Sequence, residues 1–279
     1  MRRSLVLLCV VLLACFGVRA GAGKGPDAES LLAASGKAMA AAKSYESTWL
    51  ITTSMGSMGS MKMKMEMKAL PQKRKVLVRT MPAEGGSGMM AMGAAMGQST
   101  VVMNGNTMYM YMPMLGGYYK QQLPPDAMKS PVEPIRLPKG KGVVMRYLGT
   151  RKLNGKVYDA LAITGPETPQ SKQMGMTMDM VLYLDKATHR MRGMKQVVTL
   201  KNGPTPPGAP PSAGKHAPMV ITTVMQLMSE KFNAPIPENI FNFTPPPGAK
   251  ELPMPGAPGG SAVPGFGVPG MGPGGAAPH

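Results

Sequence analysis

Hydrophobic and polar residues alternate with a period of two in three segments of this chain. The segments read MKMKMEMK at residues 61–68, MYMYMPM at 108–114 and MGMTMDMVLYL at 174–184. Successive side chains of a β-strand point to opposite faces, so a period of two predicts strands and not helices. Each strand would have one methionine face, called a Met stripe below, and one polar face, as in an antiparallel sheet that is solvated on one side.

The remaining pattern predicts one helix and a series of antiparallel strands. Asp27 is placed to cap a helix that runs to about Lys43. Asn and Gly at residues 104–106 and 154–155 mark the tight turns of two hairpins. Further strands are predicted at residues 45–53, 75–80, 99–103, 143–150, 157–164, 191–200 and 220–228. The predicted fold class is α+β, with a single curled antiparallel sheet of about nine to eleven strands and a covering N-terminal helix.

The first twenty residues predict export. Arg2 and Arg3 precede an apolar run at residues 5–18, and Ala20 ends a site that a signal peptidase could read. We expect a signal peptide at residues 1–20 and an exported, periplasmic protein. In a competing interpretation Leu12-Leu13-Ala14-Cys15 is a lipobox, and Cys15 carries a lipid anchor. No later segment approaches ~18 uninterrupted apolar residues, so no membrane-spanning helix is expected after the leader.

The folded domain is expected at residues 27–252. Residues 253–279 consist mainly of Pro, Gly and Ala, and they are predicted to form a disordered tail because they cannot bury enough apolar surface. Residues 82–97, rich in Gly and Met, are predicted to be a loop that serves either as an apolar lid or only as slack. Residues 202–218 contain six prolines and predict a second, linker-like loop.

The composition indicates an apolar surface made of flexible side chains and a protein with a positive net charge. Methionine accounts for 31 residues and aromatic residues for only 5%, so unbranched thioether side chains take the place of the usual core residues. The formal net charge is +17, of which three charges lie in the leader. This charge points either to an anionic partner, such as a membrane surface, or to a surface that is merely kept soluble. Nucleic acid is not an expected partner outside the cytoplasm.

The chain offers little for catalysis. His189, His216 and His279 are the only histidines, and the first is predicted to lie in a turn. The sequence contains no GxSxG, Walker or HExxH motif. Both cysteines, Cys9 and Cys15, lie in the leader, so no disulfide or Cys nucleophile is expected in the exported chain. We therefore expect a protein that is not an enzyme and that holds no cofactor.

Three functions remain open for the Met stripes. They could line a groove for flexible apolar guests such as acyl chains, because Met repacks at little cost. They could supply soft sulfur ligands to Cu(I), although strand neighbours at i and i+2 lie about 6.8 Å apart and several strands would have to converge. They could also fill a plain core. The groove interpretation predicts ligand-binding roles for Trp49, Ile51, Met61, Met63, Met65, Met67, Met108, Met110, Met112, Met176, Met178 and Met180, with no metal ligand.

Several segments, in this order, resemble the LolA-like family of periplasmic lipoprotein carriers and their relatives. The resemblance covers approximately residues 27–252. It is carried by the segments AAAKSYEST, VVMNGNTMYMYMP, YYKQ, YLGTRKLNGKVYDALAI, VLYLDKATHRMRGM and IPENIFNFTPPPGAKEL. The resemblance implies a half-barrel whose apolar cavity lies between the sheet and its covering helices. It also implies a carrier of acylated lipoproteins or lipids, or a sensor or envelope scaffold that docks a partner protein.

Overall fold

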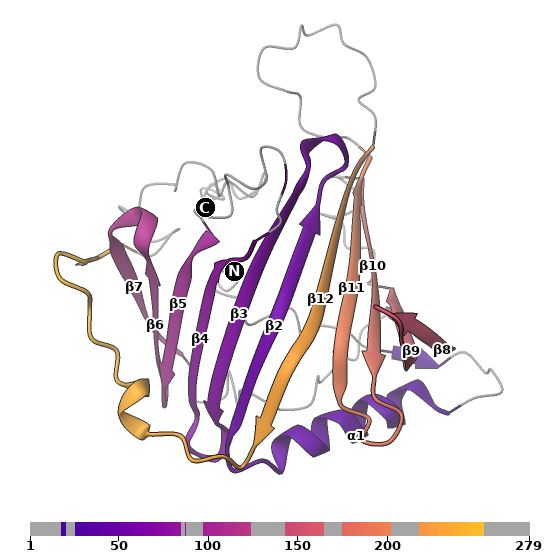
Figure 1. The fold of residues 1–279 in the computed structure, drawn as a ribbon, viewed down its shortest axis with the longest axis horizontal. Coiled ribbons are helices and arrows are strands. Elements are labelled where there is room, and N and C mark those ends of the chain that lie inside the picture. Colours follow the sequence, from indigo (N-terminus) through magenta and orange to yellow (C-terminus); the bar gives the residue numbers. More distant parts are fainter. Residues whose placement is uncertain are drawn as a thin grey trace, which may run out of the picture.

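The computed structural model describes residues 18–20, 26–84, 87, 97–123, 143–164, 175–201 and 218–253. These residues form one curled sheet of 13 strands with a single α-helix, α1 (Ala28–Ala40), beside its lower end (Figure 1). The strands are β1 (Val18–Ala20), β2 (Tyr45–Ser54), β3 (Ser60–Leu70), β4 (Lys75–Pro82), β5 (Ser99–Asn104), β6 (Thr107–Met112), β7 (Gly117–Gln122), β8 (Val143–Leu153), β9 (Lys156–Thr164), β10 (Met176–Leu184), β11 (Met191–Leu200), β12 (Met219–Phe232) and β13 (Lys250–Glu251).

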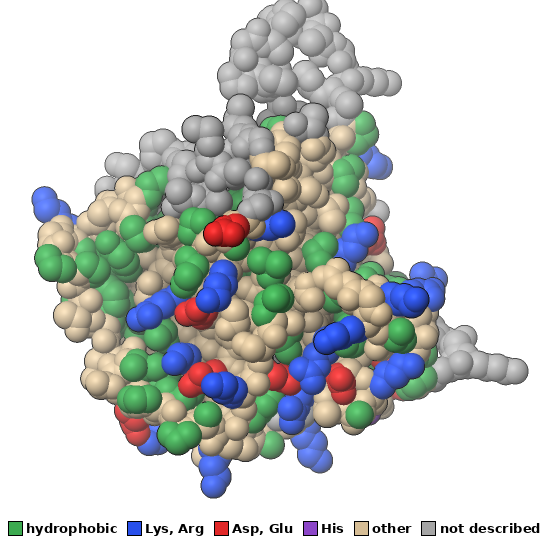
Figure 2. Space-filling model, viewed as in Figure 1, with side chains coloured by type: hydrophobic (Ala, Val, Ile, Leu, Met, Phe, Trp, Pro, Cys, Tyr) green, Lys and Arg blue, Asp and Glu red, His purple; other side chains and the backbone are tan. Residues whose placement is uncertain are grey.

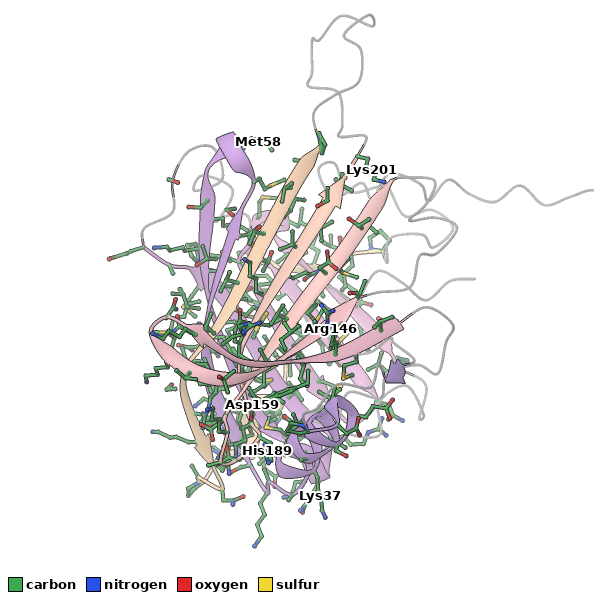
Figure 3. The ribbon with its side chains drawn as sticks, turned by 90° about the vertical axis from the view of Figure 1, so that its right-hand side faces the viewer. Lys37, Met58, Arg146, Asp159, His189 and Lys201 are labelled. Carbon is green, nitrogen blue, oxygen red and sulfur yellow. The ribbon has the colours of Figure 1, made fainter. Side chains whose placement is uncertain are left out.

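The strand order across the sheet is β1-β8-β9-β10-β11-β12-β2-β3-β4-β5-β6-β7-β13. The short edge strands β1 and β13 pair with their neighbours in parallel, and all other neighbours are antiparallel. The two edges do not pair with each other, so the sheet is an unclosed half-barrel. The turns that follow β2 and β6, and the C-terminal end of β11, lie at what we call the upper end. Figure 3 shows Met58 and Lys201 at this end, and Lys37 and His189 at the opposite, lower end.

Helix α1 begins where the sequence provides a cap. The carboxylate of Asp27 accepts hydrogen bonds from the backbone N–H groups of Glu29 and Ser30, at 3.4 and 3.1 Å. Its apolar side packs on strands β8 to β11. The buried cluster that results contains Ala28, Leu31, Leu32, Met145, Leu161, Ile163, Met180, Leu182, Leu184 and Met194. The helix therefore covers one half of the sheet, and the face that it covers is called the inner face below.

The β8–β9 hairpin bends across the outer face of the sheet (Figure 3). Its register shifts between Tyr147 and Thr150, where Gly149 has a φ of +74°. A Cβ atom on Gly193 of β11 would lie 2.3 Å from Leu153 Cδ2 and 2.9 Å from the carbonyl oxygen of Met225. The hairpin thus approaches β11 so closely that only glycine fits there.

Residues 233–249 form a C-terminal strap over the outer face of β4 to β7 (Figure 1). Phe241 of the strap is fully buried in a cluster with Leu70, Leu77 and Val102. Phe243 stacks on Tyr109 with ring centroids 4.7 Å apart. The strap then ends in β13, which extends the sheet beside β7. Apolar side chains of the strap therefore make this part of the outer face a second, smaller core.

The predicted fold class is confirmed by the observed sheet. The helix starts after Asp27 as expected, although it ends at Ala40, earlier than the predicted Lys43. Strands β2 to β6 and β8 to β12 cover the segments that the pattern predicts, and β7 is a strand that the pattern did not predict. The edge strands β1 and β13 have three and two residues, too few to show a period. The predicted signal peptide (apart from residues 18–20), most of the loops at 82–97 and 202–218, and the tail from residue 254 lie outside the described residues.

Candidate functional site

The three Met stripes share the inner face of the sheet. Directly opposed residues of neighbouring strands point to the same side, so the pairing register can be followed from strand to strand. One row of opposed residues runs through Leu182, Met194, Met225, Ile51 and Met63. A second row runs through Met67, Val78, Val101 and Met110. Together the rows link the stripes of β10, β3 and β6, which are far apart in the sequence, into one continuous surface.

On β6 and β10, burial divides this surface into a closed part and a part near the upper end that is more open. Met108, near the lower end of β6, and Met180, at the middle of β10, are each only 6% exposed and belong to the two core clusters of the inner face. Further up the same strands, Met110, Met112 and Met178 are half-buried. On β3 the order differs, because Met63 is buried and Met65 and Met67 below it are half-buried. The stripes of β6 and β10 therefore serve as core toward one end and as partly accessible surface at the other, and the stripe of β3 is partly accessible along most of its length.

The twelve sequence-predicted binding residues fall into two groups. Trp49, Met63, Met108 and Met180 are buried, at 3 to 6% exposure. The half-buried group contains Ile51, Met61, Met65, Met67, Met110, Met112, Met176 and Met178. All twelve lie on the inner face by register, and Met174, the first methionine of the third stripe, lies outside the described residues. Whether any of them touches a ligand remains a prediction.

Several polar groups on the inner face are paired with one another, although the Oε1 atom of Gln121, opposite Met108, is buried without a hydrogen-bond partner among the described residues. Thr80 Oγ1 lies 2.7 Å from Ser99 Oγ, and the Nε2 amide of Gln196 donates to the sulfur of Met178 at 2.8 Å. Trp49 Nε1 donates to Ser47 Oγ at 2.9 Å. Because these groups already have partners, an apolar guest can cover them without leaving a donor or acceptor unsatisfied.

A cluster of charged side chains lies at the lower end of the sheet. The sequence pattern did not predict it. Glu230 of β12 pairs with Arg192, and Arg190 lies 3.6 Å from the same carboxylate. The guanidinium of Arg190 lies over the Phe232 ring, 4.0 Å from its centroid. Glu230 lies 38 residues or more along the chain from both arginines, so no local pattern in the sequence indicates the cluster. Their ion pairs tie β11 to β12 below the Met stripes.

A turn holds the end of this cluster in place. Asp185 accepts hydrogen bonds from the backbone N–H groups of Ala187 and Thr188, and it lies 3.6 Å from Arg192 Nε. Burial raises the pKa of Asp185, but the Thr188 hydrogen bonds and Arg192 outweigh it, and the net shift is downward. His189 has a φ of +53° and is a turn residue, as the sequence predicted.

Charged side chains of both signs alternate on the outer face (Figure 2). Lys64 lies 2.7 Å from Glu66 along β3, and Lys68 lies 3.7 Å from Glu46 of β2. A shallow hollow with a volume of about 290 Å³ lies here, lined by side chains such as Thr48, Glu66, Lys68 and Ser229. Its charged walls do not fit an apolar guest, so the two faces of the sheet differ in the ligands that they can accept.

Two negative findings concern other kinds of site. Among the described residues, no group of three His, Cys, Asp or Glu side chains is arranged to hold a metal ion. Within the same part of the chain, no helix is long and apolar enough to cross a membrane. The first finding does not concern thioether ligands, so the copper interpretation of the Met stripes stays open.

Solved structures that are similar to this chain include LolA-like proteins. A LolA superfamily protein from Nitrosomonas europaea matches with 12% identity and a TM-score of 0.33, covering 77% of this chain and 97% of that one. An uncharacterised conserved protein from Thermus thermophilus matches with 14% identity and a TM-score of 0.42, over 80% and 97%. The Mycobacterium tuberculosis lipoprotein LppX matches with 11% identity and a TM-score of 0.36, over 75% and 98%.

The family to which the sequence motifs point is thus represented among these structures, as a likeness of fold. No family model matches the sequence, and no curated protein does. At these identities and scores the likeness says nothing about ligands.

Proposed function

We propose that this chain is an exported, non-catalytic carrier that binds an acyl chain, an acylated lipoprotein or another amphiphile on the upper part of its inner face. One observation carries the proposal: three Met stripes from distant segments meet on one face, and the methionine nearest the upper end of each stripe (Met61, Met112 and Met176) is only half-buried. A surface of this kind offers a flexible apolar guest a continuous row of thioether side chains. Burial of the guest and of these side chains would supply the binding free energy.

Methionine suits a guest whose shape varies. Its side chain is unbranched and has three rotatable bonds, so it repacks around different chains at little cost. Trp49, in the same row as Met65, adds a rigid aromatic surface beside the half-buried methionines of β3. The paired hydroxyl and amide groups between them, such as Thr80 with Ser99, do not need water. An amphiphile could therefore lay its apolar part along the stripes and keep its polar part at the upper end.

Native mass spectrometry of the protein purified from a periplasm tests the proposal directly. We expect a co-purifying lipid, and displacement of a fluorescent fatty-acid probe by unlabelled fatty acid. Absence of both lipid and probe binding would refute the carrier function. Co-purification of a protein in place of a lipid would favour a sensor or scaffold that docks a partner.

Matched variants locate the binding face. Met61→Glu and Met178→Glu place a charge on the inner face, whereas Lys62→Glu and Thr177→Glu place the same charge on the neighbouring residue of the outer face. The inner-face variants should weaken probe binding by about tenfold or more, because a charge must be desolvated by the guest. The outer-face variants should bind as the unaltered protein does. Equal weakening in both pairs would contradict the proposed location.

Cu(I) binding is a second candidate, favoured by one cluster. Met103 and Met108 are directly opposed across β5 and β6, and Met39, Met65, Met67 and Met110 pack against the same cluster. Thioethers are soft ligands that suit Cu(I). Anaerobic titration against a chromophoric Cu(I) chelator decides this candidate, and failure to compete at micromolar metal would exclude it.

A further inference from the structure

The upper end of the half-barrel carries exposed apolar side chains, and two exposed lysines lie at the same end. Met58 lies in the 3-10 turn η2 (Gly56–Met58) between β2 and β3 and is 39% exposed, and Val220 at the start of β12 is 44% exposed. Met114, in the turn η5 (Pro113–Leu115) between β6 and β7, is 43% exposed. These turns and strand starts all lie at the same end, because β2 and β6 run toward it and β12 runs away from it.

Two lysines, Lys201 and Lys250, lie at the same end as these apolar side chains. Lys201 directly follows Leu200, which is opposed to Met219, the neighbour of Val220. The backbone N–H of Lys250 bonds to the carbonyl of Gly116, at the turn that carries Met114. Lys201 and Lys250 are both exposed. Two acids, Glu84 and Glu251, also lie toward this end, and the Tyr118 hydroxyl donates to Glu251 at 3.4 Å.

We propose that this upper rim, made of Met58, Met114, Val220, Lys201 and Lys250, docks on the surface of a lipid membrane that contains anionic headgroups. An apolar side chain at the tip of a turn can enter the boundary between headgroups and acyl chains, and an adjacent lysine can pair with a headgroup phosphate. Each such lysine contributes about fivefold to membrane affinity. The formal net charge of the whole sequence is +17, and it stays strongly positive without the three charges of the predicted leader, which favours approach to an anionic surface.

The lower end does not show this combination. Its turns present ion pairs, such as Glu238 with Lys73 and Lys75, and Asp185 with Arg192. Of the other exposed apolar residues, Met228 on β12 and Val157 near the tip of the β8–β9 hairpin lie away from the rim, and Val144 lies at the start of β8. Met228 is nine residues along β12 from its upper end, a separation of about 30 Å.

Docking through the rim would bring the Met stripes next to the membrane. This part of the inference rests on the proposed carrier function. The Met stripe of β3 starts at Met61, just after η2, and that of β6 ends at Met112, just before η5. The open ends of the stripes therefore meet the turns that would touch the membrane. An acyl chain could pass from the bilayer to the inner face without crossing water.

Flotation with vesicles tests the docking. The probes are vesicles of phosphatidylcholine alone and of phosphatidylcholine mixed with phosphatidylglycerol, used with the full-length protein. We expect binding to the anionic vesicles. The variants Met58→Asp and Met114→Asp should each lower it about tenfold, as expected for loss of one buried apolar side chain. Lys201→Ser and Lys250→Ser should each lower it about fivefold, and only at low salt.

The matched controls are Met228→Asp and Val157→Asp, which place the same charge on apolar residues that are at least as exposed but lie away from the rim. Both should bind vesicles as the unaltered protein does, and circular dichroism should show that all variants fold. Absence of binding to anionic vesicles overturns the proposal. Equal losses in rim and control variants overturn it as well.

Solution binding separates this proposal from the carrier function. Met58→Asp and Met114→Asp should still bind a soluble fatty-acid probe, because they leave the half-buried part of the stripes unchanged. If no variant and no unaltered protein binds the probe but vesicle binding depends on the rim, the carrier function fails and the docking holds. If the probe binds and the vesicles do not, the docking fails and the carrier function holds.

Discussion

Trp49 and Met65 are directly opposed across β2 and β3, so the only tryptophan of the chain lies within the surface formed by the Met stripes. Trp49 is 3% exposed, and its indole N–H is held by Ser47. The indole is therefore fixed in one position beside side chains that are themselves half-buried. This arrangement makes the fluorescence of a single residue a reporter of whatever covers the inner face.

A brominated fatty acid should quench the fluorescence of Trp49. Bromine quenches only at short range, and a guest on the stripes would lie in contact with the row that contains Trp49 and Met65. The measurement is a fluorescence titration with a brominated and an unbrominated chain of the same length. Quenching by both chains, or by neither, would contradict a guest at this position.

Truncation of the stripes should have a different effect at their two ends. Met108→Ala and Met180→Ala remove side chains from the closed core clusters, and each should lower the free energy of unfolding by about 2 to 4 kcal/mol. Met112→Ala and Met176→Ala, at half-buried positions, should cost about 1 kcal/mol. Urea unfolding measures all four. Equal losses would mean that the stripes are core along their whole length.

Tyr45 should make the protein sensitive to alkaline pH. Burial is the main cause that raises the pKa of Tyr45 to about 12, and Glu230 adds to it, while the Ser47 hydrogen bond and the two arginines act in the opposite direction. A pKa above the unfolded value means that the stabilisation is complete below pH ~10 and is lost as the pH rises toward 12. Stability curves at several pH values measure the effect.

The Tyr45→Phe variant is the control for this pH dependence. It keeps the aromatic contact with Phe232, whose ring centroid lies 4.9 Å from that of Tyr45, and it removes the ionisable hydroxyl. The variant should lose less stability than the unaltered protein over the same pH range. An identical decline in both proteins would assign the pH dependence to other groups.

Phe241 should hold the C-terminal strap on the sheet. It is fully buried against Leu70, Leu77 and Val102, so Phe241→Ala should lower the free energy of unfolding by about 3 to 5 kcal/mol. Asn239→Ala, an exposed change in the same turn, should cost less than about 0.5 kcal/mol. Hydrogen exchange should show faster opening of β5 to β7 in the Phe241 variant alone.

The local pattern of the sequence determined the strands and the two faces of each strand. Period-two methionines placed Met61, Met63, Met65 and Met67 on one side of β3, and Asn-Gly pairs set the hairpin turns. The cap at Asp27 fixed the start of α1. These features follow from interactions between residues close in the sequence, and so they could be predicted without the fold.

The tertiary structure decided which strands are neighbours, and with that everything that depends on register. Alternation within β3, β6 and β10 does not say whether their Met stripes face the same side, because a shift of one residue in any pairing would reverse a face. The pairing of Glu230 with Arg192, the strap over Leu77 and the division of the stripes into buried and half-buried parts likewise join distant segments. The local sequence thus determined which face of each strand carries the methionines. Long-range packing joined these faces into one continuous surface, because only the pairing of distant strands sets their register.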